Sequence, residues 1–83
     1  MTEQEIFDKV IAILKPYVKN RDALATVSNE TNILEDLKVN SARLVDVVLA
    51  FEDEFEIEIA DEDADGVDTV GDAVSLIGNK INP

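Results

Sequence analysis

The stretch LKVNSARLVDVVLAFEDEF, residues 37–55, decides the fold, because it predicts a helix that begins at or just after Asn40. Its apolar residues recur at the spacing of one helix face, which we expect to lie in the core: Leu44, Val47, Val48, Phe51 and Phe55. Asn and Ser favour helix starts because their side chains bond to backbone groups there. Taken alone, Ser41 would therefore be an ordinary helix-start residue.

The same helix is predicted to carry a second apolar set with acids beside it, namely Ala42, Val45, Leu49, Asp46, Glu52 and Asp53. A surface helix in a monomer needs only one apolar stripe. The second set predicts a docking surface on another protein, and the alternative is a wider core.

The segment before this helix predicts a first helix and a long loop. Thr2 and Glu5 have the spacing of a capping box, and apolar residues follow at helical spacing: Ile6, Phe7, Val10, Ile11, Leu14 and Val18. They indicate a helix over about residues 3–18, with Pro16 ending or distorting its last turn. Residues 19–36 predict a loop with a turn anchored at Ile33, Leu34 and Leu37. So long a loop in so small a domain is often functional.

The segment after residue 55 predicts a link, a short helical turn and a last helix. EIEIA, residues 56–60, alternates like a strand but has no convincing partner strand, and residues 61–66 can form a helical turn. Thr69 and Asp72 have capping-box spacing, and the final helix has its apolar face at Val70, Ala73, Val74, Ile77 and Ile81. Gly78 weakens it by about 1 kcal/mol relative to Ala. We predict one all-α domain over residues 1–83, a small bundle of three main helices plus one short helix.

The composition excludes several classes of function. The 83-residue chain contains no cysteine and no histidine, so it lacks thiolate chemistry and the commonest general base and metal ligand. The N-terminus carries acids where a signal peptide needs positive charge, and no long apolar run follows. We therefore expect a cytoplasmic protein without membrane insertion. We also expect a monomer, and a protein that is not an enzyme.

The net charge of −12 is unevenly distributed. Residues 1–43 carry seven acids and six bases, whereas residues 44–79 carry twelve acids and no base. Such a field repels nucleic acid and anionic membranes, and attracts basic protein surfaces or divalent cations. A solvated face explains some of these acids, but not the absence of bases over so long a segment.

The arrangement resembles the acyl carrier proteins along nearly the whole chain. The most specific part is EDLKVNSARLVDVVLAFEDEF, where Asp36-Leu37 and Ser41 match the family pattern, as do Leu44, Val47, Val48, Phe51, Glu52 and Phe55. The segment EIEIADEDADGVDTVGDAV, with Ile59 and Thr69-Val70, is also similar to the family.

The resemblance implies a carrier in which Ser41 holds a 4′-phosphopantetheine arm through a phosphodiester. The acyl group would be a thioester on the arm, so the reactive sulfur would belong to the cofactor. The implied partners are a phosphopantetheinyl transferase and acyl-chain enzymes with basic docking surfaces. They would contact Asn40, Ala42, Arg43, Val45, Asp46, Leu49, Glu52 and Asp53. The acyl chain would lie among Phe7, Val10, Leu44, Val47, Val48 and Phe51.

Three residues depart from the family pattern. Asn40 stands where the family has Asp, Ala42 stands where it has Leu, and Arg43 replaces what is often an acid. Asn40 still caps a helix well. The corner that partners meet first is thus less acidic and less apolar than in the family pattern. This favours a carrier for a specialised pathway over the main carrier of fatty acid synthesis.

Three other hypotheses stay open on the sequence alone. DEDADGVDTVGD, residues 61–72, is close to an EF-hand calcium loop with Asp61, Asp63, Asp65 and Asp72 as ligands. Against it, position 8 is Asp68 instead of an apolar residue, position 12 is Asp instead of Glu, and no second loop exists. A peptidyl carrier would share the arm, although the acidity favours the acyl type. The last alternative is an interaction module without an arm.

Overall fold

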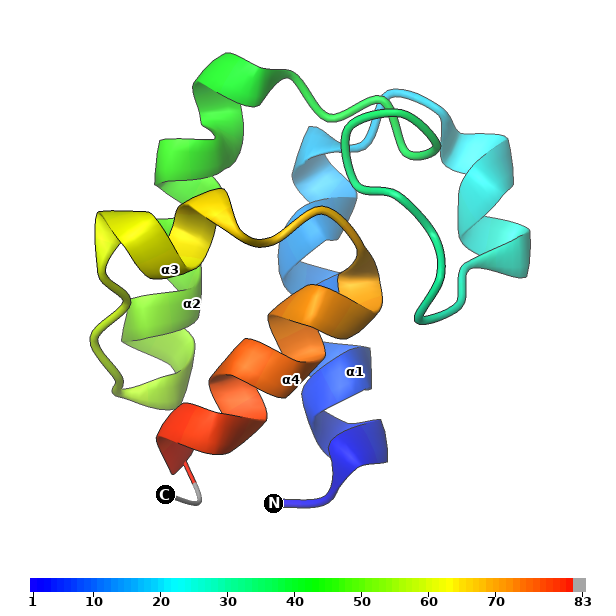
Figure 1. Cartoon of the computed structure of the whole chain (residues 1–83). Helices are drawn as coiled ribbons and strands as arrows, with labels where there is room; N and C mark the ends of the chain where they lie inside the picture. The colour runs from blue at the N-terminus through cyan, green and yellow to red at the C-terminus, as the bar shows by residue number, and fades with distance from the viewer. Residues whose placement is uncertain (82–83) are drawn as a thin grey trace.

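A computed structural model describes residues 1–81, and within them the fold is helical. The α-helices are α1 (Glu3–Leu14), α2 (Leu44–Phe55), α3 (Asp61–Asp65) and α4 (Val70–Ile81). Short 3-10 helices add η1 (Lys15–Tyr17), η2 (Arg21–Thr26) and η3 (Ser41–Arg43). The predicted all-α bundle of three main helices and one short one is confirmed (Figure 1).

The first helix begins as its sequence predicts, and its last predicted turn is distorted at Pro16. The Thr2 Oγ1 accepts the Glu5 N–H at 3.1 Å, and the Glu5 carboxylate accepts the Thr2 N–H at 3.0 Å, which completes the capping box. Pro16 lies in η1, where the α-helix tightens into a 3-10 turn instead of continuing to residue 18. Val18 is nevertheless buried, so the predicted apolar face continues past the end of α1.

The core lies where α1, α2 and α4 meet, and α4 supplies much of it. Val70, Ala73, Val74 and Ile77 are buried, as are Ile6, Val10, Leu14, Val47, Phe51 and Phe55. The expected core position of Leu44 and Val48 is only partly right, because both side chains are half-buried at the edge of this cluster. No described helix within residues 1–81 is long and apolar enough to cross a membrane.

The segment predicted as a long loop contains the 3-10 helix η2, which the sequence did not predict. Backbone bonds hold the segment in place: the Lys19 N–H donates to the Leu37 carbonyl at 3.2 Å, and the Ile33 N–H donates to the Asp68 carbonyl at 3.0 Å. Ile33 and Leu37 are buried as expected. The anchoring role predicted for Leu34 is wrong, since its side chain is 39% exposed.

Residues 57–60 of the link form no strand within the described chain, as predicted. Glu56 has a positive φ of 54° and ends α2 in the left-handed conformation. Ile59 is buried, and its N–H donates to the Glu52 carboxylate at 2.8 Å. This bond ties the link to α2 two residues before α3 begins.

Candidate functional site

Ser41 opens η3, the turn that leads directly into α2. In Figure 1 this turn stands at the end of the molecule opposite the N-terminus and the end of α4. The Ser41 side chain is exposed. Within the described residues its hydroxyl has no hydrogen-bond partner, because the capping bond here comes from the preceding residue. A free hydroxyl at this exposed end is open to modification by another protein.

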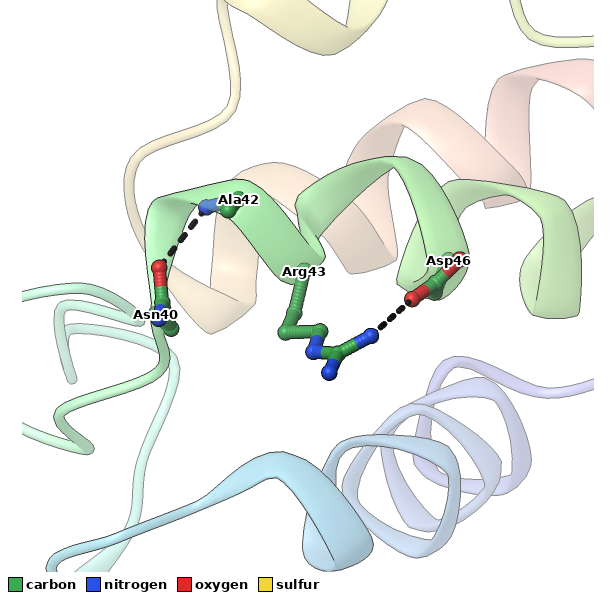
Figure 2. A network of polar contacts seen from close by, with 4 residues as sticks. All are labelled: Asn40, Ala42, Arg43 and Asp46. Carbon is green, nitrogen blue, oxygen red and sulfur yellow. Dashed lines mark hydrogen bonds and ion pairs between the residues drawn. The ribbon is translucent and has the colours of Figure 1, made fainter.

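Asn40 caps this helix start, as its residue type predicts. Its Oδ1 accepts the Ala42 N–H at 2.9 Å, and its backbone is extended, as an N-cap requires (Figure 2). The prediction of a start at Asn40 is confirmed, although the first three residues form a 3-10 turn and the α-helix begins at Leu44. Because Asn40 does the capping, Ser41 is released from that role.

Arg43 follows at the end of η3 and forms an ion pair with Asp46. Its Nη1 lies 3.3 Å from the Asp46 Oδ2 (Figure 2). The two side chains are 65% and 45% exposed, so water screens the pair, which is worth about 0–1 kcal/mol.

The second apolar set of α2 faces outward. Val45 is 67% exposed and Leu49 is 57% exposed, and Ala42 is exposed as well. This exposure excludes the alternative of a wider core. Leu49 also lines a shallow depression together with Asp46, Ala50, Asp53 and Tyr17 of η1.

Of the three acids of α2 expected to contact partners, Asp53 and Glu52 differ in their structural roles. Asp53 is exposed and lines the depression next to Leu49. Glu52 is half-buried, and one of its carboxylate oxygens accepts the Ile59 N–H. Glu52 thus stabilises the link to α3, a role that the sequence did not indicate. Tyr17 was also missed, and only its position just after Pro16 could have drawn attention to it.

The residues expected to receive an acyl chain belong to one apolar cluster beneath α2. Val10, Val47 and Phe51 are buried, with exposures of 0, 2 and 5%. Phe7, Leu44 and Val48 are half-buried and pack against the same cluster. Leu44 directly follows η3, so the apolar interior begins close to Ser41.

The residues of the calcium-loop hypothesis do not form a metal site. Asp61, Asp63 and Asp65 lie in helix α3 instead of a loop that wraps an ion, and Asp63 pairs with Lys80 at 3.2 Å. Within residues 1–81, no three acidic side chains converge in a way that could hold a metal ion. The calcium-loop hypothesis depended on a loop at residues 61–72, and the helical geometry of α3 contradicts such a loop.

Asp72, the last residue of that loop, has a different role at the start of α4. Its Oδ2 accepts the backbone N–H groups of Thr69 and Asp68, both at 3.1 Å. These two bonds, that to Thr69 first, lower the pKa of the Asp72 carboxyl from its ordinary value. The Thr69 Oγ1 accepts the Asp72 N–H at 3.1 Å, which confirms the predicted capping box.

Comparison with known proteins gives three concordant results. Residues 8–77 match the family model described as "Phosphopantetheine attachment site". The chain is 45% identical to an acyl carrier protein of Picosynechococcus over 93% of both chains, and 40% identical to one of Lactobacillus acidophilus over 93% of this chain and 94% of that one. Among solved structures, the acyl carrier protein of Enterococcus faecalis superposes with a TM-score of 0.79 at 38% identity, covering 96% of this chain and 99% of the other.

Proposed function

Because this chain belongs to the acyl carrier protein family and so carries acyl groups on a 4′-phosphopantetheine arm, we propose that the arm is attached to Ser41. The bond is a phosphodiester to the Ser41 hydroxyl. The arm supplies the thiol that forms the acyl thioester, which the chain lacks because it contains no cysteine. The exposed, unbonded hydroxyl at the start of η3 is the observation that supports this site most strongly.

The surroundings of Ser41 fit a phosphodiester. The first N–H groups of a helix have no partner within the helix, and its N-terminus carries a partial positive charge. An anion there is stabilised by about 0.3–1 kcal/mol. Asn40 takes two of the first N–H groups, that of Ala42 on its Oδ1 and that of Arg43 on its carbonyl, and leaves the serine hydroxyl free. The protein's own residues hold and orient the arm, and the chemistry on the acyl group is left to partner enzymes.

The apolar cluster beneath α2 offers a place for the acyl chain. We place the chain among Phe7, Val10, Leu44, Val47, Val48 and Phe51, entering at the half-buried Leu44 near Ser41. Burial of each methylene is worth about 0.8 kcal/mol, so an eight-carbon chain gains roughly 6 kcal/mol before ordering costs. The half-buried members can move apart more easily than the buried ones, because they have fewer neighbours to displace.

The outward face of α2 is the surface on which partners dock. Val45 and Leu49 provide an apolar centre, and Asp46 and Asp53 provide acids beside it. We expect a monomer in the cytoplasm whose partners are a phosphopantetheinyl transferase and acyl-chain enzymes with basic surfaces. Asn40, Ala42 and Arg43 give the corner beside the arm a character that suits a specialised pathway.

The attachment site is tested by incubating the protein with coenzyme A and a phosphopantetheinyl transferase, followed by intact mass measurement. Wild-type protein and Ser75→Ala, a matched control in the exposed part of α4, should each gain one arm. Ser41→Ala should gain none. A modified Ser41→Ala, or a wild-type protein that several transferases leave unmodified, would contradict the proposal.

The acyl pocket is tested by melting temperature. Proteins loaded with arms that carry no acyl group, a four-carbon group and an eight-carbon group should melt at successively higher temperatures. Enlarging the half-buried edge with Val48→Phe should reduce this gain, because the added ring occupies space that the chain needs. Equal melting temperatures for all three wild-type forms would mean that the chain stays outside the bundle.

A further inference from the structure

The charges along the outward side of α2 change sign from one end to the other. Arg43 is the last base before residues 44–79, which carry twelve acids and no base. Asp53 and Glu54 are exposed at the far end of the helix. At a rise of 1.5 Å per residue, Arg43 and Asp53 are about 15 Å apart along the axis. The exposed side chains of Val45 and Leu49 lie between them.

Helix stability does not explain an arginine at this position. A cation at a helix N-terminus is unfavourable, because the dipole there is positive. The ion pair with Asp46 is exposed and adds little, since water and salt screen it. Asn40 already provides the cap. The guanidinium extends toward Asp46, away from the capping side chain (Figure 2), so it does not support the turn that carries Ser41.

We propose that Arg43 selects the partner enzyme by pairing with an acidic side chain beside the entrance through which that enzyme receives the arm. This inference rests on the proposed attachment at Ser41, two residues earlier. The matching partner carries the acid at the entrance and basic side chains about 15 Å away, opposite Asp53 and Glu54. Its contact between these two points is apolar, to match Val45 and Leu49.

Because the Arg43–Asp46 ion pair is weak and exposed, Arg43 can exchange Asp46 for a partner carboxylate and return to it afterwards. When a partner carboxylate approaches, the planar guanidinium can bind it through two parallel hydrogen bonds. Asp46 is then released and becomes available to a partner base. An enzyme that instead places Lys or Arg at its entrance brings like charges together in a partly desolvated contact, which is unfavourable.

A charge-swap experiment tests this inference. The probes are a general ketosynthase with a basic docking surface and its variant in which the basic residue nearest the tunnel entrance is replaced by Glu. The carriers are wild type, Arg43→Glu and Arg21→Glu, all loaded with the same acyl group. Arg21 is exposed in η2, so its reversal changes the net charge equally at another place. Loading is verified by mass before each assay, so failure at Ser41 is distinguished from failure at Arg43.

The wild-type carrier should show kcat/KM about tenfold higher with the Glu variant of the ketosynthase than with the unaltered enzyme. Arg43→Glu should reverse this preference, and Arg21→Glu should keep it. Thermal unfolding of all three carriers checks that the fold is unchanged. The proposal is overturned if Arg43→Glu leaves the ratio unaltered, if Arg21→Glu shifts it equally, or if loaded wild type reacts with neither enzyme.

Discussion

Helices α2 and α4 are both twelve residues long and both have an apolar face, yet they use their apolar residues differently. In α4 the apolar side chains Val70, Ala73, Val74 and Ile77 are buried. In α2 the inner face is buried as well, but Val45 and Leu49 remain exposed on the outside. The difference indicates that α4 mainly holds the bundle together, and it supports our proposal that α2 also presents a surface to other proteins.

The largest expected effect comes from truncating one apolar side chain in each helix. Ile77 is fully buried, so Ile77→Ala should lower the free energy of unfolding by about 2–5 kcal/mol. Leu49→Ala should change it by no more than about 0.5 kcal/mol, because the side chain is exposed. Urea unfolding measures both values. Leu49→Ala should instead reduce kcat/KM for arm loading. If Ile77→Ala and Leu49→Ala had equal free energies of unfolding, the contrast between α4 and α2 would be wrong.

The second prediction is that alanine substitutions at two glycines of α4 change stability in opposite directions. A Cβ at Gly71 would lie 2.7 Å from the Asn29 carbonyl oxygen, and the Gly71 N–H donates to that same oxygen. Gly71→Ala should therefore force the backbone apart and lower the unfolding free energy by about 1–3 kcal/mol. At Gly78 the nearest atom, the Ile6 Cδ1, is 3.7 Å away, so Gly78→Ala should raise stability by up to about 1 kcal/mol. Thermal unfolding that shows the same sign for both would contradict this packing.

The smallest effect concerns the start of α4 and depends on pH. Backbone N–H groups lower the pKa of Asp72 in the folded protein, so its carboxylate stabilises the fold above the ordinary value of 3.8. That contribution is lost as the pH falls through the lowered pKa. Asp72→Asn should be less stable than wild type at pH 7 by at most about 1 kcal/mol. The difference should shrink below about pH 4.

The control for this pH effect is Asp68→Asn, which changes an exposed neighbouring acid. Both variants remove one negative charge, so they change the net repulsion among the acids equally. Only for Asp72→Asn should the difference in unfolding free energy from wild type become smaller as the pH falls. A parallel acid dependence in both variants would mean that net charge, not the cap, governs the effect.

Local signals in the sequence predicted the helices and their caps well. The capping boxes at Thr2 and Thr69 and the cap at Asn40 depend on side chains that bond to backbone groups two or three residues away. Such bonds follow from spacing alone. The exposed position of Ser41 follows from the same local geometry, although its attachment to the arm remains a prediction.

Features that depend on distant contacts were not predictable. The segment at residues 19–36 is held by bonds to Leu37 and Asp68, so the 3-10 helix within it has no local signature. The Glu52 side chain bonds to Ile59 because the link turns back at Glu56. Burial of Ile33 but not of Leu34 likewise depends on which side of the turn faces the bundle.

The measurement that tests the difference between α2 and α4 most directly is a titration of ¹⁵N-labelled protein with a phosphopantetheinyl transferase, without coenzyme A. We expect amide chemical-shift changes from Ser41 to Asp53, strongest beside Arg43, Val45 and Leu49, with α4 unaffected. The same titration with Leu49→Ala should need more transferase for half-saturation. Shift changes concentrated on α4 while the amides of α2 stay unchanged would contradict the assignment of α2 as the surface that partners bind.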